Sequence, residues 1–333
     1  MTSLMHVILI HIFVAAAALA VDRLVGDPQW IPHPVVAIGR FIQWFEKHFY
    51  RVGAAPWQQR LVGFALTLST TVLACGTTWC VVTVCSKISS WLGLAINIWI
   101  CSTTIAWKGL RDAGRAVSCE LVEHGLDSAR TAVSRIVGRD TDHLSEAEVV
   151  RATVETVAEN LVDAVVSPVL FTLIGGATLA ILYRAANTLD SMVGYRSERY
   201  RWFGFASARF DDVLNYVPAR VATSLLSGAI ACTQGDLRGA WRALVRDARK
   251  HPSPNSGIPE AMVAGALGVQ LGGLNYYGGI PSHRATMGEA RRPCVRRDIE
   301  RSVRILDAAC WMLTGALVTA MLVMILIART GRG

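Results

Sequence analysis

The sequence predicts an all-α, polytopic integral membrane protein with about five transmembrane helices, broken or re-entrant apolar segments and amphipathic cytoplasmic helices. Hydrophobic residues make up 52% of its 333 residues and charged residues only 17%, a balance that indicates lipid as part of the solvent. Several apolar stretches also reach the roughly 20 residues that a helix needs to cross a hydrocarbon core about 30 Å thick.

The expected spans lie near residues 4–21, 61–84, 91–107, 163–183 and 308–328. Residues 213–232 could form a further span or a re-entrant segment. Arg220 within this segment must then face protein or water, because a charge is costly in lipid. No internal repeat, long linker or low-complexity tract divides the chain, so residues 1–333 are expected to form a single membrane-embedded domain.

The distribution of basic residues predicts the orientation. Residues 22–60 carry five Lys or Arg residues, whereas the turn at 85–90 carries only Lys87. Because Lys and Arg are enriched in cytoplasmic loops, the functional loops are expected to face the cytoplasm from the cell inner membrane, with the N-terminus outside.

Helix signals and helix breakers alternate in the middle of the chain. Ser145 followed by Glu148 is a capping-box pattern that predicts a helix running to about Val166. The next stretch, 163–183, contains Ser-Pro and Gly-Gly pairs, so it either spans with a kink or enters and leaves on one side. Residues 233–250 are expected to form an amphipathic helix lying on the membrane surface.

The charge of the chain restricts the classes of molecule that it is expected to bind, and the cysteine pattern indicates the role of its cysteines. The net charge of +8 is dominated by arginine, whose planar guanidinium suits carboxylates, phosphates and lipid headgroups. The basic residues are scattered without a nucleic-acid-binding module, so no nucleic-acid partner is expected. The cysteines show no C-x-x-C pair and several lie in apolar runs, as small buried hydrophobes do.

An acidic stripe is predicted on the helix after the capping box. Arg151, Glu155, Glu159 and Asp163 are spaced four residues apart and therefore lie on one helix face. A solvated stripe is one interpretation. Because this stripe enters an apolar segment, we expect Glu155 and Glu159 to act catalytically, in contact with Mg²⁺ or a substrate amine.

Two polar motifs border the following apolar segments. The first contains Asn187, Asp190, Arg196 and Arg199, and the second contains Asp211, Asp212, Asn215 and Arg220. Oxygen ligands at this spacing suit a Mg²⁺ ion that retains water and bridges phosphate oxygens, so Asp190, Asp211 and Asp212 are predicted metal ligands, with Asp190 and Asp212 also catalytic. Helix capping by the acidic pair is the alternative. Asn187, Asn215 and the three arginines are predicted to bind substrate.

The segment from His251 to Glu260 reads H-P-S-P-N-S-G-I-P-E. Prolines stiffen it, and a helix is expected from about Pro259 to Leu271. Free amide groups at a helix start bind phosphate or carboxylate well, so Ser253, Asn255, Ser256 and Glu260 are predicted substrate-binding residues. A purely structural turn is the alternative.

Taken together, these motifs resemble the adenosylcobinamide-phosphate synthase (CbiB/CobD) family. The resemblance rests on seven co-ordered blocks across residues 22–279: D-R-L-V-G-D-P, H-P-V, R-A-T-V-E-T-V-A-E-N-L-V-D, N-T-L-D-S-M-V-G-Y, E-R-Y, A-R-F-D-D-V-L-N-Y-V-P-A-R and H-P-S-P-N-S-G-I-P-E. One departure is Ala164, where the family pattern has glycine after the aspartate.

The resemblance implies a membrane enzyme that joins the propionate carboxylate of adenosylcobyric acid, a corrinoid, to the amine of aminopropanol or its O-phosphate. ATP as cosubstrate, Mg²⁺ as cofactor and later cobalamin-pathway membrane enzymes as partners are implied with it. Walker, Rossmann, zinc-protease and hydrolase motifs are absent from the sequence. Two other classes stay open: an intramembrane Mg²⁺-dependent prenyl-type transferase and a non-catalytic corrinoid transporter or binding protein.

Overall fold

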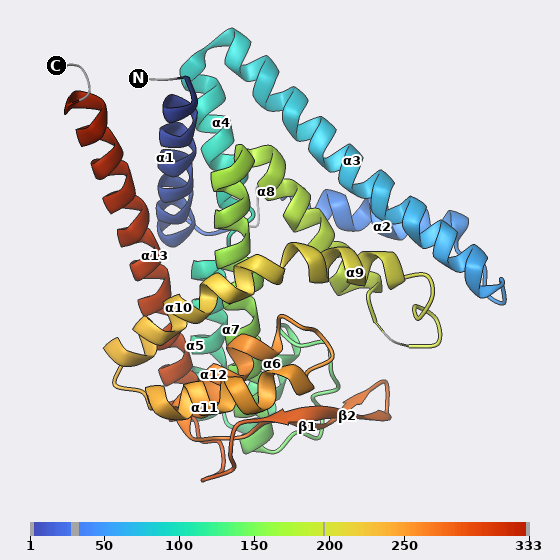
Figure 1. Ribbon diagram of the computed structural model, residues 1–333. Coiled ribbons are helices and arrows are strands. Elements are labelled where there is room, and N and C mark those ends of the chain that lie inside the picture. Colours follow the sequence, from blue (N-terminus) through green and yellow to red (C-terminus); the bar gives the residue numbers. More distant parts are fainter. Residues whose placement is uncertain (1–2, 28–32, 196, 331–333) are drawn as a thin grey trace. The chain divides into compact units, whose positions relative to one another are not determined.

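The computed structural model describes residues 3–27, 33–195 and 197–330. Contacts divide the chain into two compact units, which are described separately (Figure 1). Unit 1 comprises Met1–Ala106, Ser167–Asn215 and Ala316–Gly333, and unit 2 comprises Trp107–Val166 and Tyr216–Gly315. That the whole chain forms one membrane-embedded domain stays a prediction.

Five helices are long and apolar enough to cross a membrane: Leu4–Leu24, Pro56–Ile88, Ser90–Glu123, Glu146–Val193 and Arg297–Thr330. Each of the five expected spans lies inside one of these helices. The prediction of an all-α, polytopic membrane protein is therefore confirmed. Residues 213–232 contribute helix α10 (Tyr216–Cys232), which has 17 residues and is not among the five.

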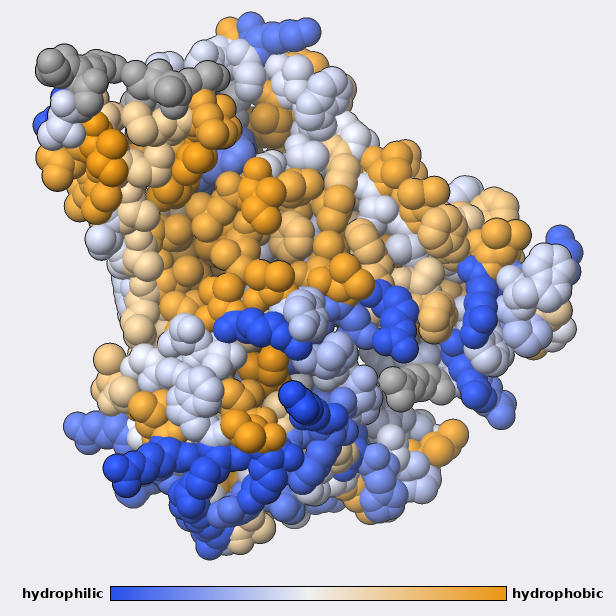
Figure 2. All heavy atoms as spheres, viewed as in Figure 1, coloured by the Kyte–Doolittle hydropathy of each residue, from blue (hydrophilic) through white to orange (hydrophobic). Residues whose placement is uncertain are grey.

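Unit 1 is built from six helices and the end of a seventh. These are α1 (Ser3–Leu24), α2 (Pro34–Phe49), α3 (Pro56–Ile88), α4 (Ser90–Ser102), α8 (Ser167–Val193), α9 (Phe205–Leu214) and the last residues of α13 (Arg297–Thr330). Helices α2, α3 and α8 share a core that includes Ile42, Leu66, Leu189 and Phe203, each with no exposed surface. Figure 2 shows apolar side chains covering the visible face of this unit.

Helix α8 is interrupted in its middle. Gly175 and Gly176 have non-helical backbone angles, with φ of +58° at Gly176, a conformation that glycine adopts without steric cost. The Asn97 side chain accepts a hydrogen bond from the freed amide of Ala177 at 2.9 Å. In Figure 1 the chain reverses direction at this point.

The two limbs of α8 contact each other below the break. Asn215 Oδ1 accepts hydrogen bonds from Ser167 Oγ at 2.6 Å and from Tyr183 OH at 3.0 Å. The ring of Tyr183 also stacks on Phe171, with centroids 5.3 Å apart. A helical hairpin with limbs in contact favours the re-entrant interpretation of this segment over a kinked span.

Unit 2 contains the capping-box helix and the polar C-terminal region. Its elements are α5 (Trp107–Glu123), α6 (Leu126–Ser134), α7 (Glu146–Leu161), the π-helix η1 (Val162–Val166), α10, α11 (Leu237–Asp247), the 3₁₀ helix η2 (Ala248–Lys250), α12 (Gly257–Leu267), β1 (Leu271–Tyr277), β2 (Ile280–Met287) and most of α13. The predicted capping box is present, because Ser145 and Glu148 bond reciprocally at the start of α7. The amphipathic helix is present as α11 with η2. The helix after the proline-rich loop is present as α12, but it ends at Leu267 and not at the predicted Leu271, because Gly268 caps it in a left-handed conformation and Leu271 begins β1.

One element of unit 2 was not predicted. Strands β1 and β2 form an antiparallel hairpin with Asn275 opposite Ser282. The two glycines at its tip, Gly278 and Gly279, have positive φ, and both of their amides donate to the Asp140 carboxylate. These glycines make the tight turn and let a neighbouring loop bind it.

Helices α11 and α12 pack unusually closely at two glycines. A Cβ on Gly265 would lie 2.3 Å from the carbonyl oxygen of Gly239. We expect Gly265→Ala to lower the free energy of unfolding by about 1–3 kcal/mol, because the two helices must separate. Thermal unfolding in detergent measures this. Gly109→Ala, at an open position of α5, is the matched control and should not destabilise; equal unfolding midpoints for the two variants would refute the close contact.

Candidate active site

The acidic face of α7 meets the β-hairpin in unit 2. Glu155 is buried, and its carboxylate pairs with the buried guanidinium of Arg139. Its second oxygen accepts a hydrogen bond from the amide of Gly272 in β1 at 2.6 Å. Because both oxygens are engaged, this geometry gives Glu155 the position of a structural anchor that joins α7 to the hairpin.

Two arginines complete this anchor. Arg139 donates to Asn275 Oδ1 at 2.7 Å, and Arg151 donates to the same oxygen at 3.1 Å. Arg151 also donates to the carbonyl oxygens of Gly272 and Leu274. The hairpin is thus held by charge-assisted hydrogen bonds along its first strand, which are stronger than neutral ones.

One turn beyond Glu155, the surroundings change from paired to unpaired polar groups. In the described part of the chain, the half-buried side chain of Glu159 makes no hydrogen bond or ion pair, whereas its backbone carbonyl accepts from the amide of Val162. Glu260 in the first turn of α12 is buried, and its Oε1 lies 3.8 Å from His251 Nε2. Neither of these two atoms has a hydrogen-bond partner among the described residues.

The electrostatics of this group favour neutral side chains. Burial, and then the negative charges of Glu159 and Glu155, hold the pKa of Glu260 well above its ordinary value. Burial lowers the pKa of His251, although Glu159 and a backbone contact oppose it. Titratable groups perturbed by burial and by specific neighbours are typical of functional sites.

The loop before α12 is fixed by an arginine of α10. Arg220 donates to Asn255 Oδ1 at 2.8 Å and lies over the ring of Tyr216, with its guanidinium carbon 3.6 Å from the ring centroid. Asn255 is buried, and its amide donates to Ser253 Oγ at 3.3 Å. Ser256 stands at the N-cap of α12 without a side-chain capping bond. Arg220 therefore faces protein, which is one of the two surroundings expected for it. It holds the loop that carries Ser253, Asn255 and Ser256, which are predicted to bind phosphate.

The predicted metal ligands lie in unit 1. Asp211 is buried and accepts from Asn215 Nδ2 at 2.9 Å, whereas half-buried Asp212 lies 3.6 Å from Arg209. Asp190 is in the last turn of α8, where its backbone carbonyl accepts from the amide of Gly194. Asn187 Oδ1 accepts from Arg184 at 3.4 Å.

The motif that contains Asn187 and Asp190 also carries two arginines that are predicted to bind substrate, Arg196 and Arg199. Arg199 binds Glu46 through two nitrogens, at 2.7 and 3.1 Å, and lies over the rings of Tyr50 and Tyr200. This pairing ties the loop to α2. Arg196 lies outside the described residues.

A resident metal site formed by side chains alone is not seen in the described ranges. Within 3–27, 33–195 and 197–330, no three His, Cys, Asp or Glu side chains gather closely enough to hold a metal ion. Asp211 and Asp212 are adjacent on α9, so their side chains diverge by about 100° around the helix. Mg²⁺ can also be held by one or two carboxylates together with water and substrate phosphates, so metal binding by these aspartates stays a prediction.

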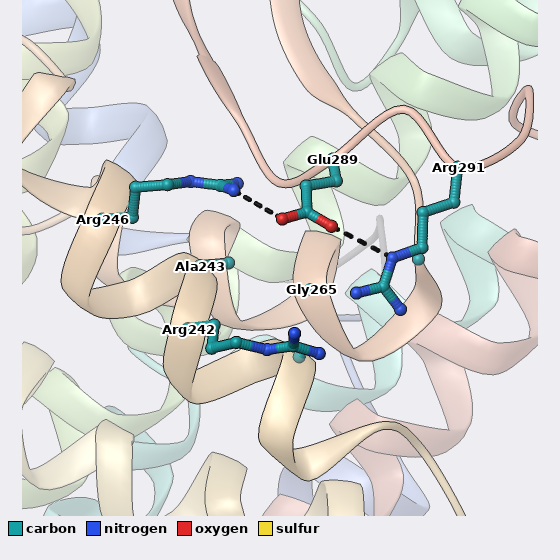
Figure 3. Close-up of a pocket in the computed structure, with 8 residues that line it drawn as sticks. Arg242, Ala243, Arg246, Gly265, Glu289 and Arg291 are labelled. Carbon is teal, nitrogen blue, oxygen red and sulfur yellow. Dashed lines mark hydrogen bonds and ion pairs between the residues drawn. The ribbon is translucent and has the colours of Figure 1, made fainter.

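A second charged group in unit 2 is neutralised internally. Arg246 and Arg291 both bind Glu289, at 2.6 and 3.1 Å, beside Arg242 (Figure 3). Arg246 also pairs with buried Asp247, and these bonds hold the pKa of that carboxyl well below its usual range. The cavity they line has a volume of about 10 Å³, which admits no more than about one water molecule. These residues stabilise the α11 surface.

Three residues near the predicted site were not singled out from the sequence: His251, Arg139 and Arg284. Arg284 lies in β2 opposite Gly273, next to the glycine that binds Glu155. His251 lies in a block that was recognised, nine positions before Glu260, but helical spacing does not connect them because the loop folds back. No local pattern marks Arg139 or Arg284, because their positions depend on the unpredicted hairpin.

These features define a polytopic membrane protein with a charge-rich site formed by α7, the proline-rich loop and α12. The chain belongs to the CobD/Cbib protein family, whose model matches residues 15–306. It is 46% identical over 298 residues to the cobalamin biosynthesis protein CobD of Geobacter metallireducens, covering 90% of this chain and 89% of that protein.

Further relatives agree. The cobalamin biosynthesis protein CobD of Halalkalibacterium halodurans is 44% identical, covering 89% of this chain and 92% of the relative. The cobalamin biosynthesis protein CbiB of Salmonella typhimurium is 42% identical, covering 91% of this chain and 95% of the relative. No solved structure matches the chain.

Proposed function

We propose that this protein is a multi-pass enzyme of cobalamin biosynthesis in the inner membrane, where it acts on a corrinoid substrate. The observation that carries the proposal is its similarity, over about nine-tenths of both chains, to proteins named for cobalamin biosynthesis. The buried, partly unpaired polar group around Glu159 and Glu260 supports catalysis, since uncompensated polar groups are otherwise costly.

The specific reaction that we propose is amide ligation. The propionate carboxylate of adenosylcobyric acid takes the γ-phosphoryl group of ATP, giving an acyl phosphate and ADP. The amine of aminopropanol, or of its O-phosphate, then attacks the carbonyl carbon, and phosphate leaves. Bound Mg²⁺ would offset charge on the phosphoryl oxygens.

Residues of both units have roles in this proposal. Asp211, Asp212 and Asp190 would hold the Mg²⁺ that arrives with ATP, and Asn187, Asn215, Arg196 and Arg199 would contact the anionic substrates. The Ser253, Asn255 and Ser256 loop at the start of α12, positioned by Arg220, would bind a phosphate group at the N-terminus of that helix. Glu159 and Glu260 would contact the amine. Glu155 would act through the hairpin that it anchors.

Turnover by the purified protein in detergent tests the proposal. We expect adenosylcobyric acid, aminopropanol phosphate, ATP and Mg²⁺ to give the new amide, detected by mass spectrometry, and no product when ATP is omitted. Tight corrinoid binding without product would instead favour a transporter or binding protein. A prenyl-type transferase would instead require a lipid diphosphate as its substrate.

A further inference from the structure

The His251 and Glu260 side chains form a buried pair with unused hydrogen-bonding capacity. Their side chains are only 8% and 4% exposed. His251 Nε2 and Glu260 Oε1 are 3.8 Å apart, too far for a hydrogen bond, and neither has another partner in the described ranges. Buried polar atoms without a hydrogen bond destabilise a fold, so a ligand that bonded these two atoms would stabilise it.

The tautomer of His251 can change without loss of its anchor. Its Nδ1 lies 3.1 Å from the amide nitrogen of Ser253 and 3.2 Å from the carbonyl oxygen of the same residue. Nδ1 can therefore accept from the amide or donate to the carbonyl. In the second case Nε2 carries the lone pair, and uptake of a proton at Nε2 leaves the Nδ1 hydrogen bond intact.

Charged side chains of α7 and β2 surround this pair. Glu159 and Glu155 act on both His251 and Glu260 from α7, and Arg284 acts on them from β2. Arg139 already neutralises Glu155. Arg284 makes no ion pair within 4.0 Å among the described residues. Glu159 and Glu260 thus remain as two carboxyl groups with free oxygens beside a neutral imidazole.

We propose that Glu159, Glu260 and His251 bind the primary ammonium group of the amine substrate, and that His251 removes its proton before the amine attacks. This inference rests on the proposed amide ligation and adds to it a named proton acceptor. An ammonium group offers three donors, which match the free oxygens of two carboxyl groups and the Nε2 lone pair.

Proton transfer from the ammonium group comes before formation of the amide bond. The ammonium proton passes to His251 Nε2, and the resulting imidazolium is stabilised by the Glu159 carboxylate. The free nitrogen lone pair forms the C–N bond with the acyl phosphate, and the C–O bond to phosphate breaks, with phosphate taking the electron pair. The departing phosphate takes the second nitrogen proton, giving the neutral amide.

Comparing two nucleophiles distinguishes a proton-accepting role of His251 from a purely structural role. Aminopropanol phosphate carries an ammonium group at neutral pH and needs a proton acceptor, whereas hydroxylamine is a neutral amine and traps the acyl phosphate without one. His251→Asn retains a group near the Nδ1 position to bond Ser253 but removes Nε2. We expect this variant to form the amide about 100-fold more slowly and to retain ATP-dependent hydroxamate formation. Raising the pH, which deprotonates the amine in solution, should restore amide formation.

Controls make the outcomes distinct. His283→Asn, at an exposed position of β2, should behave like the unaltered protein with both nucleophiles. Glu159→Gln removes no bond within the described chain and should raise KM for the amine about tenfold while leaving hydroxamate formation unchanged. Equal losses with both nucleophiles in His251→Asn, or no loss at all, would overturn the role of His251. If the unaltered protein forms neither product, the ligation itself is wrong.

Discussion

Replacement of Glu155 by alanine is expected to lower the free energy of unfolding by about 3–5 kcal/mol, because it leaves the buried guanidinium of Arg139 without its carboxylate. The variant also loses the bond to the Gly272 amide, which is one of the links between α7 and the hairpin. Thermal unfolding in detergent, followed by tryptophan fluorescence, measures the effect.

Two further variants identify its cause. Glu155→Gln keeps an oxygen for Gly272 but loses the charge, so it should fall between the alanine variant and the unaltered protein. Glu123→Ala removes an exposed carboxylate of α5 and should leave the unfolding midpoint in place. If Glu155→Ala unfolds like Glu123→Ala, the anchor described here contributes nothing to stability.

The second large effect is expected at Asp212. Replacing it with asparagine should slow amide formation by about 10³-fold, equivalent to ~4 kcal/mol of transition-state stabilisation, if its carboxylate holds the Mg²⁺ that neutralises the phosphoryl group. The measurement is the rate of product formation over a series of Mg²⁺ concentrations. The variant should need more Mg²⁺ to reach its own maximum.

The control for Asp212→Asn is the same substitution at an aspartate that has no proposed role in catalysis. Asp127 in the first turn of α6 has a side chain that is 94% exposed, and among the described residues its carboxylate pairs with Arg130. Asp127→Asn should retain full activity and the same Mg²⁺ dependence. Activity of Asp212→Asn at that level would rule out the metal assignment.

The sequence predicted most of the helices because their signals are local. The apolar stretches, the capping box at Ser145 and the break at Gly175 and Gly176 each depend on neighbouring residues, and each is present in the structure. The β-hairpin was missed because its glycines weaken strand propensity. Its stability comes from Glu155, Arg151 and Asp140, which are more than 100 positions away.

The sequence predicted many of the residues of the candidate site, but it did not predict which of them contact each other. Sequence spacing placed Glu155 and Glu159 on one helix face, and they are there. Spacing could not show that Arg139 already neutralises the first carboxylate while the second remains unpaired, because Arg139 reaches α7 from a loop. Nor could it place His251 against Glu260, since that contact depends on the path of a proline-rich loop.

The reversal of α8 also bears on whether the number of membrane crossings is odd or even. A helical hairpin that enters and leaves on one side adds no net crossing, so the four other long apolar helices would set the topology. An even number of crossings returns the chain to the side from which it started, and Ser3 and Thr330 would then share a compartment. The same count would keep the Asp190 and Asp211 motifs on the side of the membrane from which this hairpin enters.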